Sequence, residues 1–258
     1  MLFSVLFCNC GGGGSNDDNV VDVGRFRRMV SDSKDVTPAL KRAMRSAKEL
    51  GRGLTATVYR AVFDGNEVAV KRIDKRIKLT TSVKSALQHE VNLLRHLQKV
   101  RSGHRHLCNF YNVYEDQKFI YVVLELCRGG ELFDYIVNHN TGKHFSEKEI
   151  AVLILQIARG LHTLHMAGVV HRDLKPENVV LKYDPKSKSF PENSLKIMDF
   201  GFSLLKGVGC EGKNLMVVGS PQYMSPEICS AYFDGTDPVY TPSCDIWVCV
   251  VLFSLFFF

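Results

Sequence analysis

One stretch of eight residues, H-R-D-L-K-P-E-N at positions 171–178, most constrains what this chain can be. The simplest interpretation is a polar loop before a strand, with Asp173 as a turn residue. For a single aspartate that interpretation is sufficient. Here a second short sequence, Asp199-Phe200-Gly201, follows further along the chain. Whether Asp173 is more than a turn residue therefore depends on the segments that precede it.

A glycine-bearing segment reads L-G-R-G-L-T-A-T-V at residues 50–58. Gly51 and Gly53 would let the backbone approach a phosphate without a side chain in the way. A β-hairpin turn can also carry two glycines, so this segment alone is weak evidence. The next apolar run, V-A-V-K at 68–71, predicts a strand that ends in Lys71. A buried lysine needs a partner.

A helix is predicted over residues 80–100, because apolar residues recur there at helical spacing. These residues are Val83, Leu87, Val91, Leu94 and Leu97. Glu90 lies on this helix and is the expected partner of Lys71. Four histidines also occur here, at positions 89, 96, 104 and 106, but their spacing fits no metal motif. We interpret them as surface or helix-end residues.

The middle of the chain predicts a buried strand and a long helix. Residues 119–124 form a continuous apolar run, F-I-Y-V-V-L, which is followed by E-L-C-R-G-G-E-L-F. Residues 146–166 show amphipathic spacing, and Ser146 with Glu149 forms a capping box at their start. Taken alone, residues 119–133 would be read as a strand, a turn and a helix.

Together these motifs resemble a serine/threonine protein kinase. The resemblance covers about residues 49–247 and rests on the catalytic-loop pattern H-R-D-L-x-x-x-N, the glycine-rich loop, the V-A-I-K strand and D-F-G. Ala56 replaces the third glycine of the loop. The segment E-L-C-x-G-G-E-L-F most resembles the calcium/calmodulin-regulated and calcium-dependent group. The resemblance implies an α+β, two-lobed fold with a β-rich small lobe (about 49–126) and a mostly helical larger lobe (127–258).

The resemblance also implies roles for individual residues, with ATP and Mg²⁺ as cofactors. Asp173 would orient the substrate hydroxyl and accept its proton, Lys175 would steady the phosphoryl group, and Asn178 and Asp199 would hold Mg²⁺. The remaining nucleotide-binding candidates are Leu50, Gly51, Gly53, Val58, Ala69, Lys71, Glu90, Glu125, Cys127 and Glu131. Among them, the backbones of Glu125 and Cys127 would bond adenine beside the gatekeeper Leu124. Glu131 would meet the ribose or a basic substrate residue.

The activation segment would run from Asp199 to Glu227. Residues 204–219 contain no Ser, Thr or Tyr, so phosphorylation cannot occur there. Arg172 would normally meet such a phosphate. We hypothesise that Glu211, or nothing, takes its place. Before this segment, residues 183–194 form a polar insertion that a hairpin between two strands can absorb.

The end of the chain departs from the family pattern. Ser243–Trp247 resembles the start of a central helix, whose Asp245 would bond the backbone of the catalytic loop. The sequence then becomes apolar and ends at Phe258, where the family continues with further helices and an arginine partner for Glu227. We therefore expect a C-terminally truncated domain with an exposed apolar helix. Residues 1–48 are expected to be a flexible or unassigned extension with a loose helix near 38–48, and order is expected from about Glu49.

Composition limits the partners and the compartment. The net charge of +6 comes without a long Lys/Arg run, so no nucleic-acid partner is expected. No apolar run reaches the roughly 20 residues of a transmembrane helix. The eight cysteines form no zinc pattern, and reduced thiols in the cytoplasm, or the nucleus, are expected. Membrane association through acylated Cys8 or Cys10 has no support.

The expected function is ATP-dependent phosphorylation of Ser/Thr hydroxyls in proteins, with a preference for basic substrate motifs near Glu131 and Glu177. The alternative is a catalytically impaired remnant that acts as a nucleotide- or protein-binding module. Small-molecule kinase activity is disfavoured by Lys175 and by the S-P-E sequence at 225–227. No EF-hand pattern occurs, so no calcium-sensor module is expected in this chain.

Overall fold

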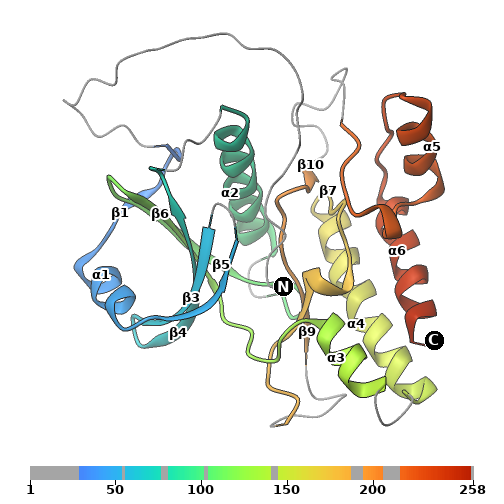
Figure 1. Ribbon diagram of the computed structural model, residues 1–258, viewed down its shortest axis with the longest axis horizontal. Helices are drawn as coiled ribbons and strands as arrows, with labels where there is room; N and C mark the ends of the chain where they lie inside the picture. Colours follow the sequence, from blue (N-terminus) through green and yellow to red (C-terminus); the bar gives the residue numbers. More distant parts are fainter. Residues whose placement is uncertain are drawn as a thin grey trace.

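The computed structural model describes residues 29–53, 56–76, 81–101, 104–140, 145–186, 194–205 and 216–256. They form a small lobe built on one sheet and a larger, mainly helical lobe (Figure 1). The α+β, two-lobed architecture expected from the sequence is therefore confirmed.

The described part of the small lobe contains a six-stranded sheet with the order β1-β5-β6-β4-β3-β2. Its strands are β1 (Lys34–Asp35), β2 (Lys48–Arg52), β3 (Ala56–Phe63), β4 (Asn66–Asp74), β5 (Phe110–Glu115) and β6 (Phe119–Glu125). β1 pairs parallel with β5, and the other neighbours pair antiparallel. The strands predicted at 68–71 and 119–124 are β4 and β6.

Two helices cover opposite faces of this sheet, α1 (Pro38–Arg45) and α2 (Thr81–Arg101) (Figure 1). Successive side chains of a strand point to opposite faces. Val68 and Val70 of β4 pack in one cluster with α1, whereas Ile73 packs with α2 in the main core. The sheet is thus buried on both faces.

The expected start of order near Glu49 is wrong, because α1 and β1 precede it. Thr37 caps α1 by accepting a hydrogen bond from the N–H of Leu40 at 3.1 Å, and Pro38 occupies the first turn. Leu40 is fully buried against the outer face of the sheet. The helix expected near 38–48 is therefore present as an integral part of the small lobe.

The larger lobe contains α3 (Leu132–Asn140), α4 (Glu147–Met166), α5 (Pro226–Asp234), α6 (Pro242–Leu255), the short 3-10 turns η1 (Pro176–Asn178) and η2 (Pro221–Tyr223), and the strand pairs β7 (Val169–Val170) with β10 (Leu204–Leu205) and β8 (Val179–Leu181) with β9 (Leu195–Ile197). The capping box predicted for α4 is confirmed, since Ser146 and Glu149 exchange backbone-to-side-chain hydrogen bonds. The antiparallel pairing of β8 with β9 confirms the hairpin around the polar insertion, of which residues 187–193 lie outside the described part.

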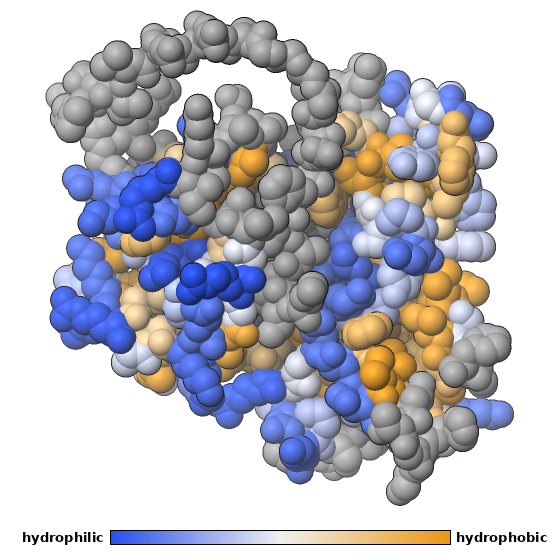
Figure 2. Space-filling model, viewed as in Figure 1, coloured by the Kyte–Doolittle hydropathy of each residue, from blue (hydrophilic) through white to orange (hydrophobic). Residues whose placement is uncertain are grey.

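Helix α6 is apolar on both its inner and its outer side. Val248, Leu252 and Phe256 join the main core, where Phe256 meets the ring of Phe145 at 5.2 Å between centroids. The outward side chains include Trp247 and Val250, and Figure 2 shows apolar side chains gathered over this helix. Within the described residues, no helix is long and apolar enough to cross a bilayer.

A single carboxylate ties the segment before β1 to the sheet. Glu115, at the end of β5, is 1% exposed and accepts hydrogen bonds from the N–H groups of Met29 (2.6 Å) and Val30 (3.1 Å). It also accepts from the Ser33 hydroxyl and the Lys75 ammonium, both at 2.8 Å. Burial alone would raise the pKa of Glu115, but these donors outweigh burial and hold the pKa below its usual value.

We predict that Glu115 makes the small lobe sensitive to acid. Because its pKa is lower in the folded chain, its stabilising effect is complete above the unfolded value of about 4.5 and is lost as the pH falls through the folded value. Thermal unfolding between about pH 3 and pH 7 should therefore show a steeper acid loss for the natural chain than for Glu115→Gln. Asp237→Asn, at an exposed loop position, should keep the natural slope. Equal slopes for the natural chain and Glu115→Gln would contradict this role.

Candidate active site

A cavity of about 570 Å³ lies between the small-lobe sheet and the β8–β9 hairpin. Its volume is typical of a small-molecule site. Many of the predicted nucleotide-binding residues line it, namely Leu50, Val58, Ala69, Lys71, Glu90, Glu125, Cys127 and Asp199. The gatekeeper candidate Leu124 also lines the cavity, with Met198 and Phe200. The cavity therefore combines apolar walls with charged groups.

Three other predicted binding residues are not among those that line the cavity. The turn after β2 is closed by a hydrogen bond from the Gly53 N–H to the carbonyl of Ala56, at 2.8 Å. Gly51 lies in β2 itself. Glu131 sits just before α3 and forms a β-bridge with Val180. Residues 54 and 55 of the glycine-bearing segment lie outside the described part.

The link between the two lobes is held by the side chain of Glu125. Its carboxylate meets the Lys196 ammonium at 2.7 Å, and its backbone N–H donates to the carbonyl of Asn109 at 2.8 Å. The thiol of Cys108 contacts the carbonyl of Glu125 at 3.7 Å. The backbone that leads to Cys127 is thus fixed at the wall of the cavity.

The ion pair expected between strand and helix is present. The ammonium of Lys71 on β4 meets both carboxylate oxygens of Glu90 on α2, at 2.8 and 3.1 Å. Burial alone would lower the pKa of Lys71, but the charges of Glu90 and Asp199 more than compensate and raise it above its usual value. Lys71 therefore stays charged at the inner end of the cavity.

Asp245 of α6 shapes the catalytic-loop segment, as the sequence predicted. Its two carboxylate oxygens accept from the N–H groups of His171 (2.9 Å) and Arg172 (3.0 Å), and His165 of α4 contacts it at 2.8 Å. Arg172 has a φ of 68°, which is uncommon for a residue with a side chain. A buried acceptor that binds two consecutive N–H groups stabilises this backbone turn.

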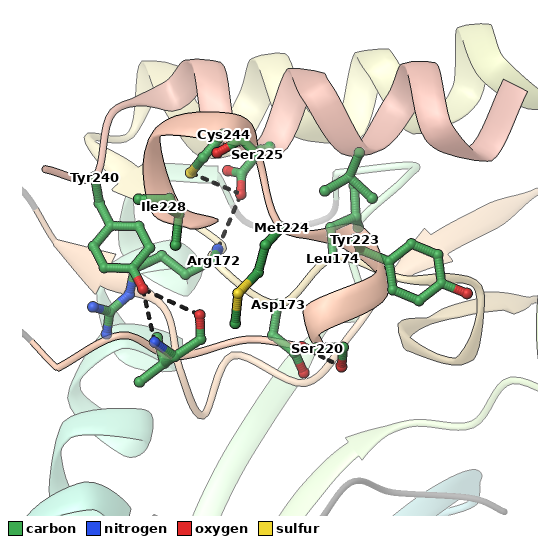
Figure 3. A pocket seen from close by; sticks show the side chains of 13 residues that line it. Arg172, Asp173, Leu174, Ser220, Tyr223, Met224, Ser225, Ile228, Tyr240 and Cys244 are labelled. Carbon is green, nitrogen blue, oxygen red and sulfur yellow. Dashed lines mark hydrogen bonds between the residues drawn. The ribbon is translucent and has the colours of Figure 1, made fainter. Parts of the chain in front are cut away.

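The side chains predicted to be catalytic meet around Asp173. Asn178 donates to the carbonyl of Asp173 at 2.7 Å, and the Lys175 ammonium lies 3.2 Å from the Asp173 carboxylate. Ser220 completes the group, since its hydroxyl donates to Asp173 at 2.9 Å (Figure 3). The same hydroxyl accepts from the Lys175 ammonium at 2.9 Å. No role for Ser220 was predicted from the sequence. Residues 219–223 read G-S-P-Q-Y, and the place of Ser220 in this run, just before the S-P-E sequence, was the signal that could have identified it.

Gly219 brings the end of the activation segment against the catalytic loop. Its φ is 111°, and a Cβ at this position would lie 2.6 Å from the carbonyl oxygen of Arg172. Only glycine fits such a conformation and such a close approach. The glycine therefore allows Ser220 to reach Asp173.

Arg172 is held by groups other than a phosphate. Its Nε donates to the carbonyl of Phe202 at 2.6 Å, and its guanidinium lies 4.8 Å from the ring centroid of Tyr240 (Figure 3). The Tyr240 hydroxyl in turn bonds the backbone N–H and carbonyl of Val218. Glu211 lies outside the described residues, so its suggested role stays a prediction.

The side-chain oxygens of Asn178 and Asp199 suit a magnesium ion. Asn178 directs its amide nitrogen to Asp173, so the other end of that amide is an oxygen. Asp199 lines the cavity with a carboxylate. Oxygen ligands of this kind, completed by phosphate oxygens and water, suit Mg²⁺.

The histidines near α2 serve the fold. His89 and His96 bond the carbonyls of Ser203 and Ala167, which links α2 to the larger lobe. His106 is only 5% exposed, so the expectation of a surface position is wrong for it. Across the described ranges, no group of three or more His, Cys, Asp or Glu residues is arranged to hold a metal ion.

We predict that Asp245→Asn destabilises the fold by about 2 kcal/mol, because one of its two acceptor oxygens becomes an amide N–H₂ and the backbone N–H group that faces it loses its acceptor. Denaturant unfolding followed by circular dichroism measures this free energy. The exposed Asp237→Asn should change it by less than about 0.5 kcal/mol. A similar small change for Asp245→Asn would show that the loop does not need this acceptor.

Comparisons with known proteins agree with this geometry. The family model described as "protein kinase domain" matches residues 44–258. The calcium-dependent protein kinase 6 of Oryza sativa subsp. japonica is 36% identical over 84% of this chain and 36% of its own length. The calcium-dependent protein kinase 26 of Arabidopsis thaliana is 34% identical over 85% of this chain and 42% of its own length.

A relative from an animal shows the same likeness. The phosphorylase b kinase gamma catalytic chain, liver/testis isoform, of Rattus norvegicus is 34% identical over 80% of this chain. The chain spans between 36% and 48% of the lengths of these three relatives. With the family model matching most of its residues and the catalytic-loop, cavity and activation-segment motifs in one site, the chain belongs to the protein kinase domain family.

Proposed function

We propose that this chain transfers the γ-phosphoryl group of ATP to Ser or Thr hydroxyls of proteins. The observation that carries the proposal is the closed group of Asp173, Lys175, Asn178 and Ser220 beside the cavity that holds Lys71 and Asp199. A polar loop without a catalytic role would not require a carboxylate, an ammonium and an amide in mutual contact.

The cavity supplies the nucleotide site. Val58, Ala69 and Leu124 would enclose the adenine, and the backbone of Glu125 and Cys127 would bond its edge. Lys71, kept charged by Glu90, would bind the phosphates. Asn178 and Asp199 would hold Mg²⁺, which offsets phosphate charge when it is bound.

The reaction needs positioning more than covalent chemistry. Asp173 would align the substrate hydroxyl and accept its proton as the oxygen–phosphorus bond to the substrate forms and the bond to ADP breaks. Lys175, 3.2 Å from Asp173, would offset charge on the transferring group. Lys175 also favours Ser/Thr over Tyr substrates, because tyrosine kinases differ at this position in the resembled family.

Asp173→Asn should lower phosphate transfer by about 10²-fold or more, since the amide cannot accept the proton. The measurement is transfer from ATP–Mg to an Arg-x-x-Ser peptide, with Asp237→Asn as a control that should keep full activity. Nucleotide binding, measured in parallel by calorimetry, should survive in Asp173→Asn. Unchanged transfer in Asp173→Asn would exclude the proposed mechanism.

A second candidate is an impaired remnant that binds nucleotide or protein without transfer. The outward apolar side chains of α6, such as Trp247 (40% exposed) and Val250 (59% exposed), favour it because they offer a surface for association. Nucleotide binding without transfer by the natural chain would select this candidate.

Two acidic residues support a preference for basic substrates. Within the described residues, buried carboxylate oxygens of Glu131 and Glu177 have no hydrogen-bond partner. Burial raises the pKa of Glu131, and the charge of Glu177 adds to this effect. Unpaired buried acceptors are costly, and a guanidinium group would satisfy both. We infer that arginine before the phosphosite meets them.

The preference predicts that replacing Arg by Ala in an Arg-x-x-Ser peptide lowers kcat/KM by roughly tenfold for the natural chain. In Glu131→Gln and Glu177→Gln the two peptides should differ less. Glu147→Gln, an exposed change on α4, should leave the preference as it is. Equal use of both peptides by the natural chain would remove this part of the proposal.

The cellular location and the partners of this chain are also proposals. We propose protein substrates and a cytoplasmic location with reduced thiols, in keeping with the free state of Cys108, Cys127, Cys229, Cys244 and Cys249. No calcium regulation is proposed for these residues. We propose a lobe boundary near residues 126 and 127, between β6 and α3.

A further inference from the structure

Residues 29–33, here called the N-terminal strap, lie before the part of the chain that matches the family model. Family membership therefore assigns them no role. Two of these residues are deeply placed, because Val30 is fully buried and Ser33 is 5% exposed. Burial of these two side chains makes the strap an integral part of the folded small lobe.

The strap is fixed to the sheet at one side. Glu115 of β5 receives the N–H groups of Met29 and Val30 and the hydroxyl of Ser33. The Val30 side chain enters the main core together with residues of β4 and α2, among them Ile73, Leu87 and Val91. The strap thus has a fixed position relative to the strand that follows α2.

The strap also makes polar contacts to α2, through the backbone of Ser31. The N–H of Ser31 donates to the side-chain oxygen of Gln88 at 2.7 Å, and the guanidinium of Arg95 donates to the carbonyl of Ser31 at 2.8 Å. Gln88 and Arg95 are two helical turns apart, about 10 Å along the axis. Two contacts so spaced on one residue oppose both sliding and rotation of the helix.

Gln88 lies only two residues before Glu90, which pairs with Lys71 in the cavity. We propose that the N-terminal strap positions α2 so that Glu90 meets Lys71, and that Gln88 and Arg95 are positioning residues for phosphate transfer. The proposal rests on the proposed kinase function. Its physical basis is a helix with two positions, of which the strap favours the one that forms the ion pair.

The test compares two double variants of the full chain. Gln88→Ala with Arg95→Ala removes both contacts to Ser31 and leaves Glu115 and the core intact. Ser85→Ala with Lys99→Ala makes a matched change, one neutral and one cationic side chain, at exposed positions of the same helix. Hydrogen exchange of α2 amides, thermal unfolding, ATP–Mg affinity and phosphate transfer are measured for each.

The strap variant should show faster exchange along α2 and a roughly tenfold loss of kcat, since two hydrogen bonds bias the helix. The matched variant should show neither effect. A loss of thermal stability with unchanged kcat and unchanged ATP–Mg affinity would overturn the proposal, because it would make the strap a purely structural element. Unchanged exchange along α2 would overturn it as well.

A double-mutant cycle with Glu90→Gln identifies the route of the effect. If the strap acts through Glu90, the strap variant should cause no further loss of kcat or ATP–Mg affinity in a Glu90→Gln background. An equal loss in both backgrounds would show that the strap acts elsewhere and would overturn the proposal. If the natural chain transfers no phosphate, the proposed function fails. The exchange and affinity measurements then still decide whether the strap positions α2.

Discussion

The ion pair between Lys71 and Glu90 is the interaction on which the arrangement of the small lobe depends most. Both groups are largely buried, with 18% and 7% of their side chains exposed. Charges taken out of water at this depth are tolerated only when they are paired, and removing one partner of a buried pair costs about 3–5 kcal/mol. The pair joins a strand to a helix, so its 2.8 Å distance depends on how α2 sits against the sheet. Packing along α2, the histidine contacts to the larger lobe and the residues before β1 all bear on that one distance.

The catalytic loop depends on a different kind of restraint. It has little regular structure of its own, and Arg172 adopts a positive φ. Its shape comes from Asp245, 74 residues later in the chain, which accepts two consecutive N–H groups. The activation segment then reaches the same loop through Gly219 and Ser220. The site is therefore assembled from elements distant in sequence, which a few buried polar contacts hold together.

Residue patterns predicted those parts of the protein whose spacing is local or belongs to a known motif. The strand that ends in Lys71, the helix that carries Glu90 and the capped helix α4 were all readable, because apolar periodicity and capping residues are properties of neighbouring positions. The residues that line the cavity came largely from motif positions.

Other features of the structure could not be predicted from the sequence, each for a particular physical reason. The strap is held by backbone N–H groups on Glu115, and no sequence pattern records which carboxylate will accept them. Helix α1 has only two turns and a strongly basic sequence, which hides the burial of Leu40 and Ala43. The Thr37-Pro38 pair at its start was an available signal, since both residues are typical of a helix N-terminus. Ser220 was visible but gained its meaning only from the approach of two loops.

The position of α1 has a consequence for how this protein can be handled. The family match begins at residue 44, and a recombinant fragment cut there would lose Leu40 and Ala43 from the outer face of the sheet. Phe63, Val68 and Tyr121, which these residues help to cover, would then meet water over one contiguous area. Exposed apolar area of that kind promotes self-association and loss during purification. A trimmed version that keeps the chain from Met29 onward would retain the cover, and a protease that cleaves between α1 and β2 would remove it.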